Sequence, residues 1–413
     1  MGFKVGIVGA GQFSKCFIPL FQAHPFVDEV VLADIHPERC NKYAAAFGLE
    51  RTFSSLDELL LSDVDAVAIF TQRHLHGEHT LKALKAGKHV YCAVPMAQSQ
   101  EEISLILEEI KRSRLIYMTG ETSYYYPSTV LCRDRYNAGH LGKFVYGEAQ
   151  YLHDMLHGFY DAFKHSGGAD WKKVAGIPPM YYPTHSASMI LSVTGAKSTH
   201  VSCLGFVDQH EDGIFKKGGN LWDNPFSNQS ALVRTSDGGI MRLNEFRRVG
   251  WGGKNSVYMS MFGTSGSYEE HAGGSAWSNL KWGEVENLTP ELQCKDQYVQ
   301  LSEGESTHHV LEHDFNASLA KVHHSYRLPD SFEGMPNGHH GSHQFLVDDF
   351  MKAVRTNKLP PNHAWRAADY MMPGLIAHES SLRNGEMLEV PDHGEAPSGW
   401  DLLDPDSFVA YPY

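Results

Sequence analysis

An apolar run that stops abruptly at three small residues constrains this chain more than any other feature. Lys4–Val8 is typical of a buried strand, Gly9-Ala10-Gly11 follows it, and Gln12–Ala23 is predicted to be a helix. Glycines let the backbone turn tightly against a ligand, and the helix N-terminus that follows favours an anion. The pattern predicts the first unit of a doubly wound α/β domain with a pyrophosphate-binding turn.

An acidic residue ends the next apolar run and indicates which dinucleotide the turn would bind. Asp34 directly follows Val30–Ala33. A carboxylate at this strand end can accept both hydroxyls of an adenosine ribose and would repel a 2′-phosphate, so NAD is favoured over NADP. Ser14 occupies the third glycine position, so helix and strand are expected to pack less closely there. The plainer alternative is a glycine-rich turn with a surface aspartate.

Length and charge limit the remaining possibilities. A chain of 413 residues is expected to form two domains, 1–122 and 123–413, with the C-terminal helices free to pack back on the first. The 35 basic and 49 acidic residues give a formal charge of −14, which argues against nucleic acid or an anionic membrane as partner. The first strand begins almost at Met1 and apolar runs are short, so a cytoplasmic protein is expected.

The hydrophobic pattern changes character along the chain. Up to about Thr119, short apolar strands alternate with amphipathic helices, which predicts a parallel doubly wound sheet. Beyond Gly142, alternating stretches predict an α+β domain with an open antiparallel sheet. These stretches are Phe144–His153, Val201–Gln209, Ala231–Thr235, Gly239–Arg248 and Ser256–Gly263. A helix is expected at Tyr182–Val193, and Gly266–Asn337 is expected to hold little regular structure.

These residues resemble the Gfo/Idh/MocA family, which pairs an N-terminal Rossmann domain with a C-terminal open sheet. The matching segments are Gly6–Gly11, Asp34, Thr71–His76, Ala86–Val90 and Gly263–Gly266. The resemblance implies NAD as cofactor, a small carbohydrate as substrate, and a homodimer or homotetramer formed through the sheet. It implies cofactor contacts at Gly9, Gly11, Gln12, Phe13, Asp34, Thr71, Gln72, Arg73, His76, Val94, Pro95 and Glu121.

Two departures from the family pattern bear on the reaction. Family members usually carry Glu-Lys-Pro after the fifth strand and an Asp-x-x-x-His pair, whereas this chain has Ala93-Val94-Pro95 and Tyr181…His185. Valine supplies neither a proton donor nor a base, so an ordinary alcohol dehydrogenase is less favoured. The same departures are similar to those of glycoside hydrolase family 109, as is the segment Glu148–Asp154.

The resemblance to family 109 implies a redox-neutral hydrolysis. NAD⁺ oxidises the sugar C3 hydroxyl, the C2 proton becomes acidic, the aglycone leaves by elimination, water adds, and the hydride returns. His185 is assigned as acceptor of the C3 hydroxyl proton, because an imidazole titrates near neutral pH. Tyr182 is expected on the same helix face, acidified enough to remove the C2 proton or orient the ketone. Alternatively, the two are a packed helix entry and a core histidine.

Further candidates for the substrate site are Tyr151, His153, Asp154, Arg248 and His340. Alternation places Tyr151 and His153 on one face at a strand end. Arg248 ends an unusually charged strand; if buried it would suit an anionic sugar, and if exposed it is simply solvated. His339, His340 and His343 lack companion carboxylates or cysteines at ligand spacing, so no metal is expected.

Three functions remain open on sequence grounds. The first is an NAD-dependent glycoside hydrolase, and the second is a net sugar or glycoside dehydrogenase that uses His185 without the lysine. The third is a catalytically silent NAD-binding sensor. Retention of Tyr182, His185 and Asp34 favours an enzyme, because a sensor has no need of groups that transfer protons.

Overall fold

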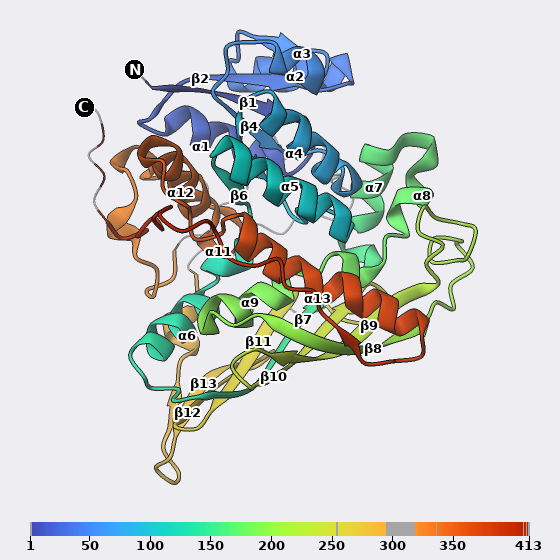
Figure 1. The fold of residues 1–413 in the computed structure, drawn as a ribbon, viewed down its shortest axis with the longest axis vertical. Coiled ribbons are helices and arrows are strands. Elements are labelled where there is room, and N and C mark those ends of the chain that lie inside the picture. Colours follow the sequence, from blue (N-terminus) through green and yellow to red (C-terminus); the bar gives the residue numbers. More distant parts are fainter. Residues whose placement is uncertain are drawn as a thin grey trace.

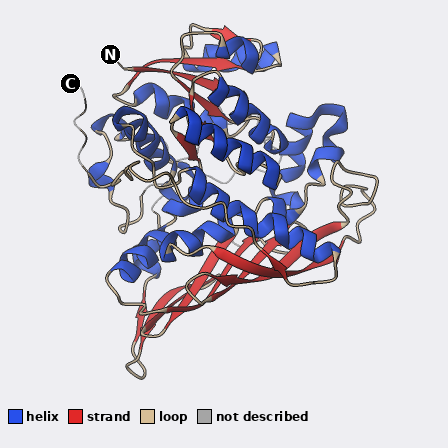
Figure 2. Ribbon diagram, in the orientation of Figure 1, coloured by secondary structure: helices blue, strands red, loops and turns tan. Residues whose placement is uncertain are grey.

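The fold, taken from a computed structural model, is described for residues 2–252, 255–294, 319–335, 337–407, 409 and 411 (Figure 1). It contains two sheets, a six-stranded one near the N-terminus and a nine-stranded one in the second half of the chain. Figure 2 shows helices gathered around the first sheet and on one face of the second, whose other face stays uncovered. The predicted combination of an α/β domain with an α+β domain is confirmed.

The first sheet has the strand order β3-β2-β1-β4-β5-β6, and all of its pairings are parallel. Its strands are β1 (Phe3–Val8), β2 (Val27–Ala33), β3 (Thr52–Phe53), β4 (Ala66–Ile69), β5 (His89–Cys92) and β6 (Tyr117–Thr119). The helices between them are α1 (Ile18–Ala23), α2 (Pro37–Phe47), α3 (Leu56–Leu60), α4 (His76–Lys85) and α5 (Gln100–Ser113). Every residue of β4 is buried, as expected for a strand covered on both faces.

The first helix is shorter than predicted. In place of one helix over Gln12–Ala23, a 3₁₀ turn at Ser14–Cys16 precedes the six-residue α1. Pro19 explains the break, because a proline is tolerated in the first turn of a helix but would clash with a carbonyl four residues earlier in a continuous one. The glycine turn is therefore followed by a short irregular segment rather than by a long helix.

The second sheet has the order β14-β13-β12-β11-β7-β10-β9-β8-β15 and is mostly antiparallel, with one parallel pair between β7 and β10. Its strands are β7 (Phe144–Leu152), β8 (Ser198–Val207), β9 (Phe226–Thr235), β10 (Ile240–Phe246), β11 (Val257–Gly263), β12 (Gly266–His271), β13 (Gly274–Asn279), β14 (Val285–Asn287) and β15 (Leu388–Glu389). The helices of this half are α6 (Pro127–Asn137), α7 (Tyr160–Gly167), α8 (Trp171–Ala175), α9 (Thr184–Thr194), α10 (Thr289–Leu292), α11 (Gly338–Gly341), α12 (His343–Thr356) and α13 (Ala364–Leu382).

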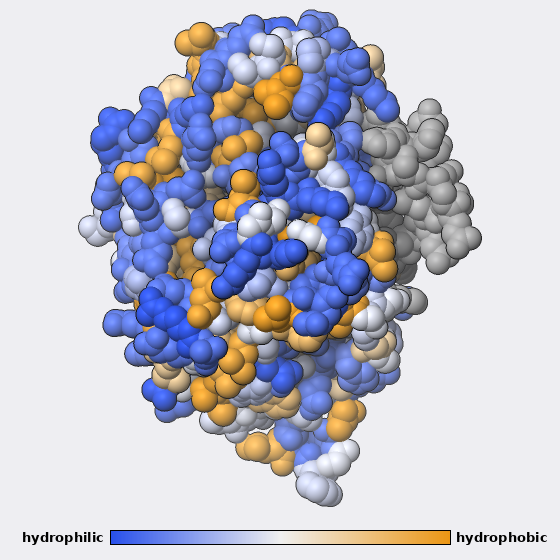
Figure 3. All heavy atoms as spheres, turned by 90° about the vertical axis from the view of Figure 1, so that its right-hand side faces the viewer, coloured by the Kyte–Doolittle hydropathy of each residue, from blue (hydrophilic) through white to orange (hydrophobic). Residues whose placement is uncertain are grey.

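The prediction of little regular structure over Gly266–Asn337 was wrong for its first part, which forms β12, β13 and β14 at the edge of the sheet. Tyr268 and Trp277 are the large buried apolar side chains of these three strands. Because most of the other side chains face solvent, the sequence of the segment is polar and resembles that of a loop. Residues 295–318 of that segment lie outside the described part of the chain. Helices α7 and α8 were not anticipated either; they lie on the side of the molecule shown in Figure 3, where hydrophilic side chains predominate.

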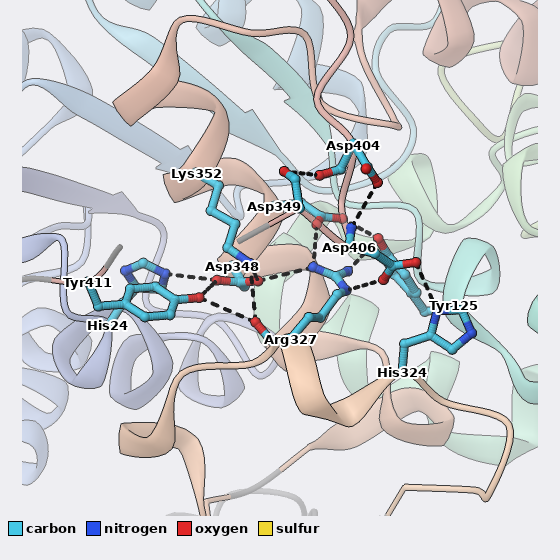
Figure 4. A network of polar contacts seen from close by, with 11 residues as sticks. His24, Tyr125, His324, Arg327, Asp348, Asp349, Lys352, Asp404, Asp406 and Tyr411 are labelled. Atoms are coloured by element: carbon cyan, nitrogen blue, oxygen red, sulfur yellow. Dashed lines mark hydrogen bonds and ion pairs between the residues drawn. The ribbon is translucent and has the colours of Figure 1, made fainter. Parts of the chain in front are cut away.

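A buried polar network joins the end of the chain to the first domain (Figure 4). We call it the C-terminal network: His24, Tyr125, Arg327, Asp348, Asp349, Lys352 and Tyr411. Arg327 donates to Asp348 (3.0 Å) and Asp349 (2.8 Å), and Lys352 lies 2.8 Å from Asp348. The Tyr411 hydroxyl donates to Asp348 at 2.8 Å, and the His24 ring, just after α1, lies 3.4 Å from the same carboxylate. Helix α12 thereby packs on α1, where Phe21 and Phe350 are in ring contact.

Candidate active site

The glycine turn has the shape that a dinucleotide requires. Gly9 has φ +101°, and a Cβ there would lie 2.8 Å from the Phe70 carbonyl oxygen, so only glycine fits. A Cβ on Gly11 would meet nothing closer than that same oxygen, at 3.9 Å, which leaves room above the turn. Asp34 accepts hydrogen bonds from the backbone N–H of Ala10 (2.7 Å) and His36 (2.7 Å) and so fixes the end of β2 against the turn. These residues fit NAD.

The predicted cofactor residues after β4 and β5 lie in two neighbouring loops that His76 joins. Its ring contacts the carbonyl oxygens of Pro95 (2.7 Å) and Thr71 (3.1 Å). Burial lowers the pKa of His76 to about 4, so the ring is neutral at physiological pH. Val94 is buried immediately before Pro95, where the family lysine would stand. Gln72 donates to the Ser166 carbonyl oxygen (2.7 Å) and links this loop to α7.

His185 is paired with a carboxylate that the sequence did not assign to it. Its Nδ1 lies 2.7 Å from Glu121 Oε1, and both residues are buried. Glu121 follows β6 and also accepts from the Ser123 backbone N–H (2.8 Å). Burial opposes ionisation of this carboxyl, yet the charge of His185 and its hydrogen bond outweigh burial and lower the pKa of Glu121. A ring that donates Nδ1–H to Glu121 can use its other nitrogen, Nε2, to accept a proton from a ligand and pass it back.

Tyr182 lies beside His185 but not in the way predicted. It precedes α9, because Pro183 delays the helix to Thr184; the two ring centroids are nevertheless 5.2 Å apart. Burial raises the pKa of Tyr182, although the nearby Arg73 cation opposes the rise. The predicted acidification of Tyr182 was therefore wrong, and the side chain is a neutral phenol that can donate a hydrogen bond.

Tyr182 forms one wall of a small pocket between the two halves of the chain. The lining residues are Arg73, Met155, Phe159, Phe163, Ala175, Ile177, Pro178, Tyr182 and Arg247. The Arg73 guanidinium carbon lies 4.9 Å from the Tyr182 ring centroid, 5.1 Å from that of Phe163 and 5.4 Å from that of Phe159. A residue expected at the cofactor thus faces aromatic rings of the second domain.

The end of β7 is held by internal contacts. His153 Nε2 lies 2.8 Å from the His157 carbonyl oxygen, which can only accept, so Nε2 carries the ring proton. The other ring nitrogen, Nδ1, therefore accepts a hydrogen bond from the Tyr151 hydroxyl at 2.7 Å. Tyr151 and His153 do share a face, and the Tyr151 ring contacts His185 at 5.1 Å. Asp154 instead caps the following turn, accepting from the backbone N–H groups of Leu156 (2.9 Å) and Val249 (2.8 Å).

Of two neighbouring arginines, the one predicted to contact substrate lies elsewhere. Arg248 is bound to Asp212 and the Tyr160 hydroxyl. Arg247 lines the pocket instead, 4.6 Å from the Tyr151 ring centroid, and pairs with Glu245 Oε2 at 2.9 Å. Glu245 also accepts from Ser186 (2.6 Å). Burial raises the pKa of Glu245 to about 7, with Arg247 acting in the opposite direction.

The histidines of the loop before α12 lie near the glycine turn. His339 Nδ1 is 2.9 Å from His343 Nε2, and both rings contact Phe13, which was predicted at the cofactor. His340 packs against the Tyr126 ring at 4.7 Å. His339 and His340 both have positive φ, +48° and +56°, a strained backbone for these residues. Within the described ranges no three His, Cys, Asp or Glu side chains are grouped to hold a metal ion.

Comparison with known proteins agrees with this geometry. Residues 3–121 match the Gfo/Idh/MocA oxidoreductase family with its NAD-binding Rossmann fold. Several relatives named "Glycosyl hydrolase family 109 protein" match almost the whole chain; the one from Streptomyces niveus is 23% identical and covers 94% of this chain and 77% of its own length. The predicted resemblance is confirmed.

Dehydrogenases are also similar to this chain. Levoglucosan dehydrogenase of Pseudarthrobacter phenanthrenivorans is 27% identical over 37% of this chain and 41% of its own length. A levoglucosan dehydrogenase solved with NADH and levoglucosan has a TM-score of 0.68 at 17% identity and covers 95% of this chain and all of that one. An oxidoreductase domain protein from Kribbella flavida gives a TM-score of 0.70 at 17% identity with the same coverage.

Every helix among the described residues is too short or too polar to cross a membrane.

Some pocket residues carried no usable signal in the sequence. Phe159 and Phe163 are four positions apart, a spacing that the packed face of any helix shows, so nothing marked them as pocket residues. Glu121 did carry a signal, because it follows a parallel strand at the edge where ligands bind in such sheets. Its partner could not be identified, since His185 lies 64 positions further along the chain.

Proposed function

We propose that this chain is an NAD-dependent glycoside hydrolase that acts by transient oxidation at C3 of the sugar, with no net redox change. The observation that carries the proposal is the buried pair of His185 and Glu121, 2.7 Å apart, beside Tyr182 and next to the loops at the carboxyl ends of β4, β5 and β6. Relatives named for family 109 that span 94% of the chain support the same assignment.

In the proposed reaction, His185 accepts a proton from the sugar, and Tyr182 donates a hydrogen bond to it. His185 Nε2 would accept the C3 hydroxyl proton, and Glu121 would stabilise the imidazolium that forms. The neutral Tyr182 phenol would donate a hydrogen bond to the C3 oxygen once it becomes a carbonyl, which makes the C2 proton more acidic. NAD⁺, when bound, supplies the hydride acceptor and later returns the hydride. Val94 contributes no proton-transferring group.

The test uses 4-nitrophenyl glycosides of both anomeric configurations and the protein loaded with NAD. Release of 4-nitrophenol without accumulation of NADH, together with deuterium incorporation at sugar C2 in D₂O, is the expected result. Removal of NAD should abolish the release, and re-addition should restore it. Aglycone release that persists without NAD, or without isotope exchange at C2, would contradict the proposal.

A second candidate function is net oxidation of a sugar or glycoside. It is favoured by the same His185–Glu121 pair, which suffices to accept a hydroxyl proton, and by the similar fold of levoglucosan dehydrogenase. Accumulation of NADH in proportion to substrate, with the glycosidic bond intact, would select it. A silent sensor would bind NAD and show neither reaction.

We also propose that the open face of the second sheet is covered by another copy of the chain. Leu204, Phe206 and Leu232 lie on this face and are each more than half exposed. Exposed apolar side chains grouped on an open sheet favour association. Light scattering coupled to size exclusion should give at least twice the 46.2 kDa of one chain, and a monomer at micromolar concentration would contradict it.

A further inference from the structure

The Arg73 guanidinium differs from the other cations near the pocket. Arg247 is paired with Glu245 at 2.9 Å, and Arg248 with Asp212. No Asp or Glu among the described residues lies within 4.0 Å of Arg73, whose neighbours are the rings of Tyr182, Phe159 and Phe163. In a chain with 49 acidic residues, this half-buried cation has no acidic partner among the described residues and interacts instead with the Tyr182 side chain and two phenylalanine rings.

Ring faces hold a guanidinium in place but do not neutralise it. Each cation–π contact contributes about 0.5–2 kcal/mol and uses no N–H donor, so the hydrogen bond with Tyr182 still leaves donors of Arg73 available for an anion. The planar fork of arginine matches the two oxygens of a carboxylate, which is the strongest common use of this side chain. Desolvation of an unpaired cation is costly, so an anionic ligand gains more here than at an exposed arginine.

The position of Arg73 favours the substrate over the cofactor as the source of that anion. It follows β4, but all three rings around its guanidinium belong to the second domain. It lines the same pocket as Arg247 and the apolar residues Met155 and Ile177. Its charge also acts on Tyr151 and Tyr182, whose rings contact His185, and on His153, which is hydrogen-bonded to Tyr151.

We propose that Arg73 binds a carboxylate or chemically similar anionic group of the substrate, and that the preferred substrates are therefore anionic glycosides. This inference rests on the proposed function and names its substrate class. The anion could belong to the sugar or to the aglycone, since both would lie close to Tyr182.

The test compares three probes with the NAD-loaded protein: a 4-nitrophenyl hexoside, the matching 4-nitrophenyl hexuronide, and the matching 4-carboxyphenyl hexoside. We expect kcat/KM to be about 10- to 100-fold higher for one of the two anionic probes than for the neutral one, mainly through KM, as a charged hydrogen-bonded pair typically gives. The probe that shows the preference identifies the source of the anion. Arg73→Gln should remove the preference.

The matched control is Arg242→Gln, which removes the same charge from a surface pair with Glu148. It should keep the preference. Titration calorimetry of glucuronate and galacturonate against glucose and galactose, on the NAD-loaded protein, gives a readout that is independent of turnover. Tighter binding of the acids that depends on Arg73, with no aglycone release, would refute the proposed function and leave this inference intact. Equal kcat/KM for all three probes, together with equal affinity for acids and neutral sugars, would overturn it, as would an Arg73→Gln variant that loses only NAD affinity.

Discussion

The molecule contains two buried clusters of charged and titratable groups, and they differ in how completely their members are paired. In the C-terminal network, Asp348 receives contacts from Arg327, Lys352, Tyr411 and His24. In the candidate active site, Glu121 interacts with His185, Ser123 and Thr184, but its buried Oε2 has no well-formed hydrogen bond among the described residues. Arg73 interacts there with Tyr182 and two phenylalanine rings and has no acidic partner among the described residues. A saturated cluster stabilises the fold, whereas spare hydrogen-bonding capacity is what a ligand needs.

The first prediction concerns the unsaturated cluster. His185→Gln should lower kcat by about 10²- to 10⁴-fold, because it removes the proton acceptor while an amide of similar size can still reach Glu121. Steady-state rates with 4-nitrophenyl glycosides and NADH fluorescence titration would check it. His200→Gln, in β8 of the second sheet, is the matched control and should keep full activity. A His185→Gln variant with near-normal kcat would remove His185 from the reaction.

The second prediction concerns the saturated cluster. Asp348→Asn should lower the free energy of unfolding by about 3–5 kcal/mol, because Lys352 and Arg327 lose their shared counter-charge in a buried setting. Denaturant titration measures the loss.

Glu121→Gln is the matching change at the active site, and it should destabilise far less while reducing activity strongly. Equal losses of stability in the two variants would erase the distinction between the clusters.

The third prediction follows from buried neutral histidines. Burial lowers the pKa of His343 to about 3 and that of His363 to about 3. Because the folded pKa lies below the unfolded value of about 6.5, their contribution to stability is complete above that value and is lost as pH falls. Each should remove about 1.4 kcal/mol between pH 7.5 and 5.5. Unfolding titrations should show a shallower loss for His343→Gln, and an unchanged slope would contradict its burial as a neutral ring.

The smallest predicted effect is at the end of the chain. Tyr411→Phe should cost about 1 kcal/mol, since Asp348 keeps its bonds to Arg327 and Lys352 when the 2.8 Å hydrogen bond from the phenol is lost. Tyr146→Phe removes a similar tyrosine–carboxylate bond, to Glu148, at a more exposed place and should cost less. Thermal unfolding of both variants would check the order, and a reversed order would count against a structural role for Tyr411.

The first domain could be predicted from the sequence because its central strands are covered on both faces. Runs such as Ala66–Ile69 are then continuously apolar and end at the residues that face the ligand. Strands β12 to β14 could not be predicted, since an edge strand with few buried side chains resembles a loop in composition.

Both members of the central pair of the candidate site could be named from the sequence, but their pairing could not. His185 and Glu121 were each expected to be functional, yet their contact depends on how β6 and α9 meet in space. Arg247 lines the pocket, whereas the sequence analysis named Arg248, and the reason for this difference is local. Strand β10 ends at Phe246, so alternation no longer determines which of the next two side chains turns inward.

The bond between Glu121 and His185 spans the junction of the two halves, with one partner just after the last parallel strand and the other in α9. If either half were exchanged for that of a relative with the usual aspartate–histidine spacing, Glu121 or His185 would remain buried without its partner. Chimeras and directed-evolution libraries built on this scaffold should therefore keep positions 121 and 185 together as a single inherited unit.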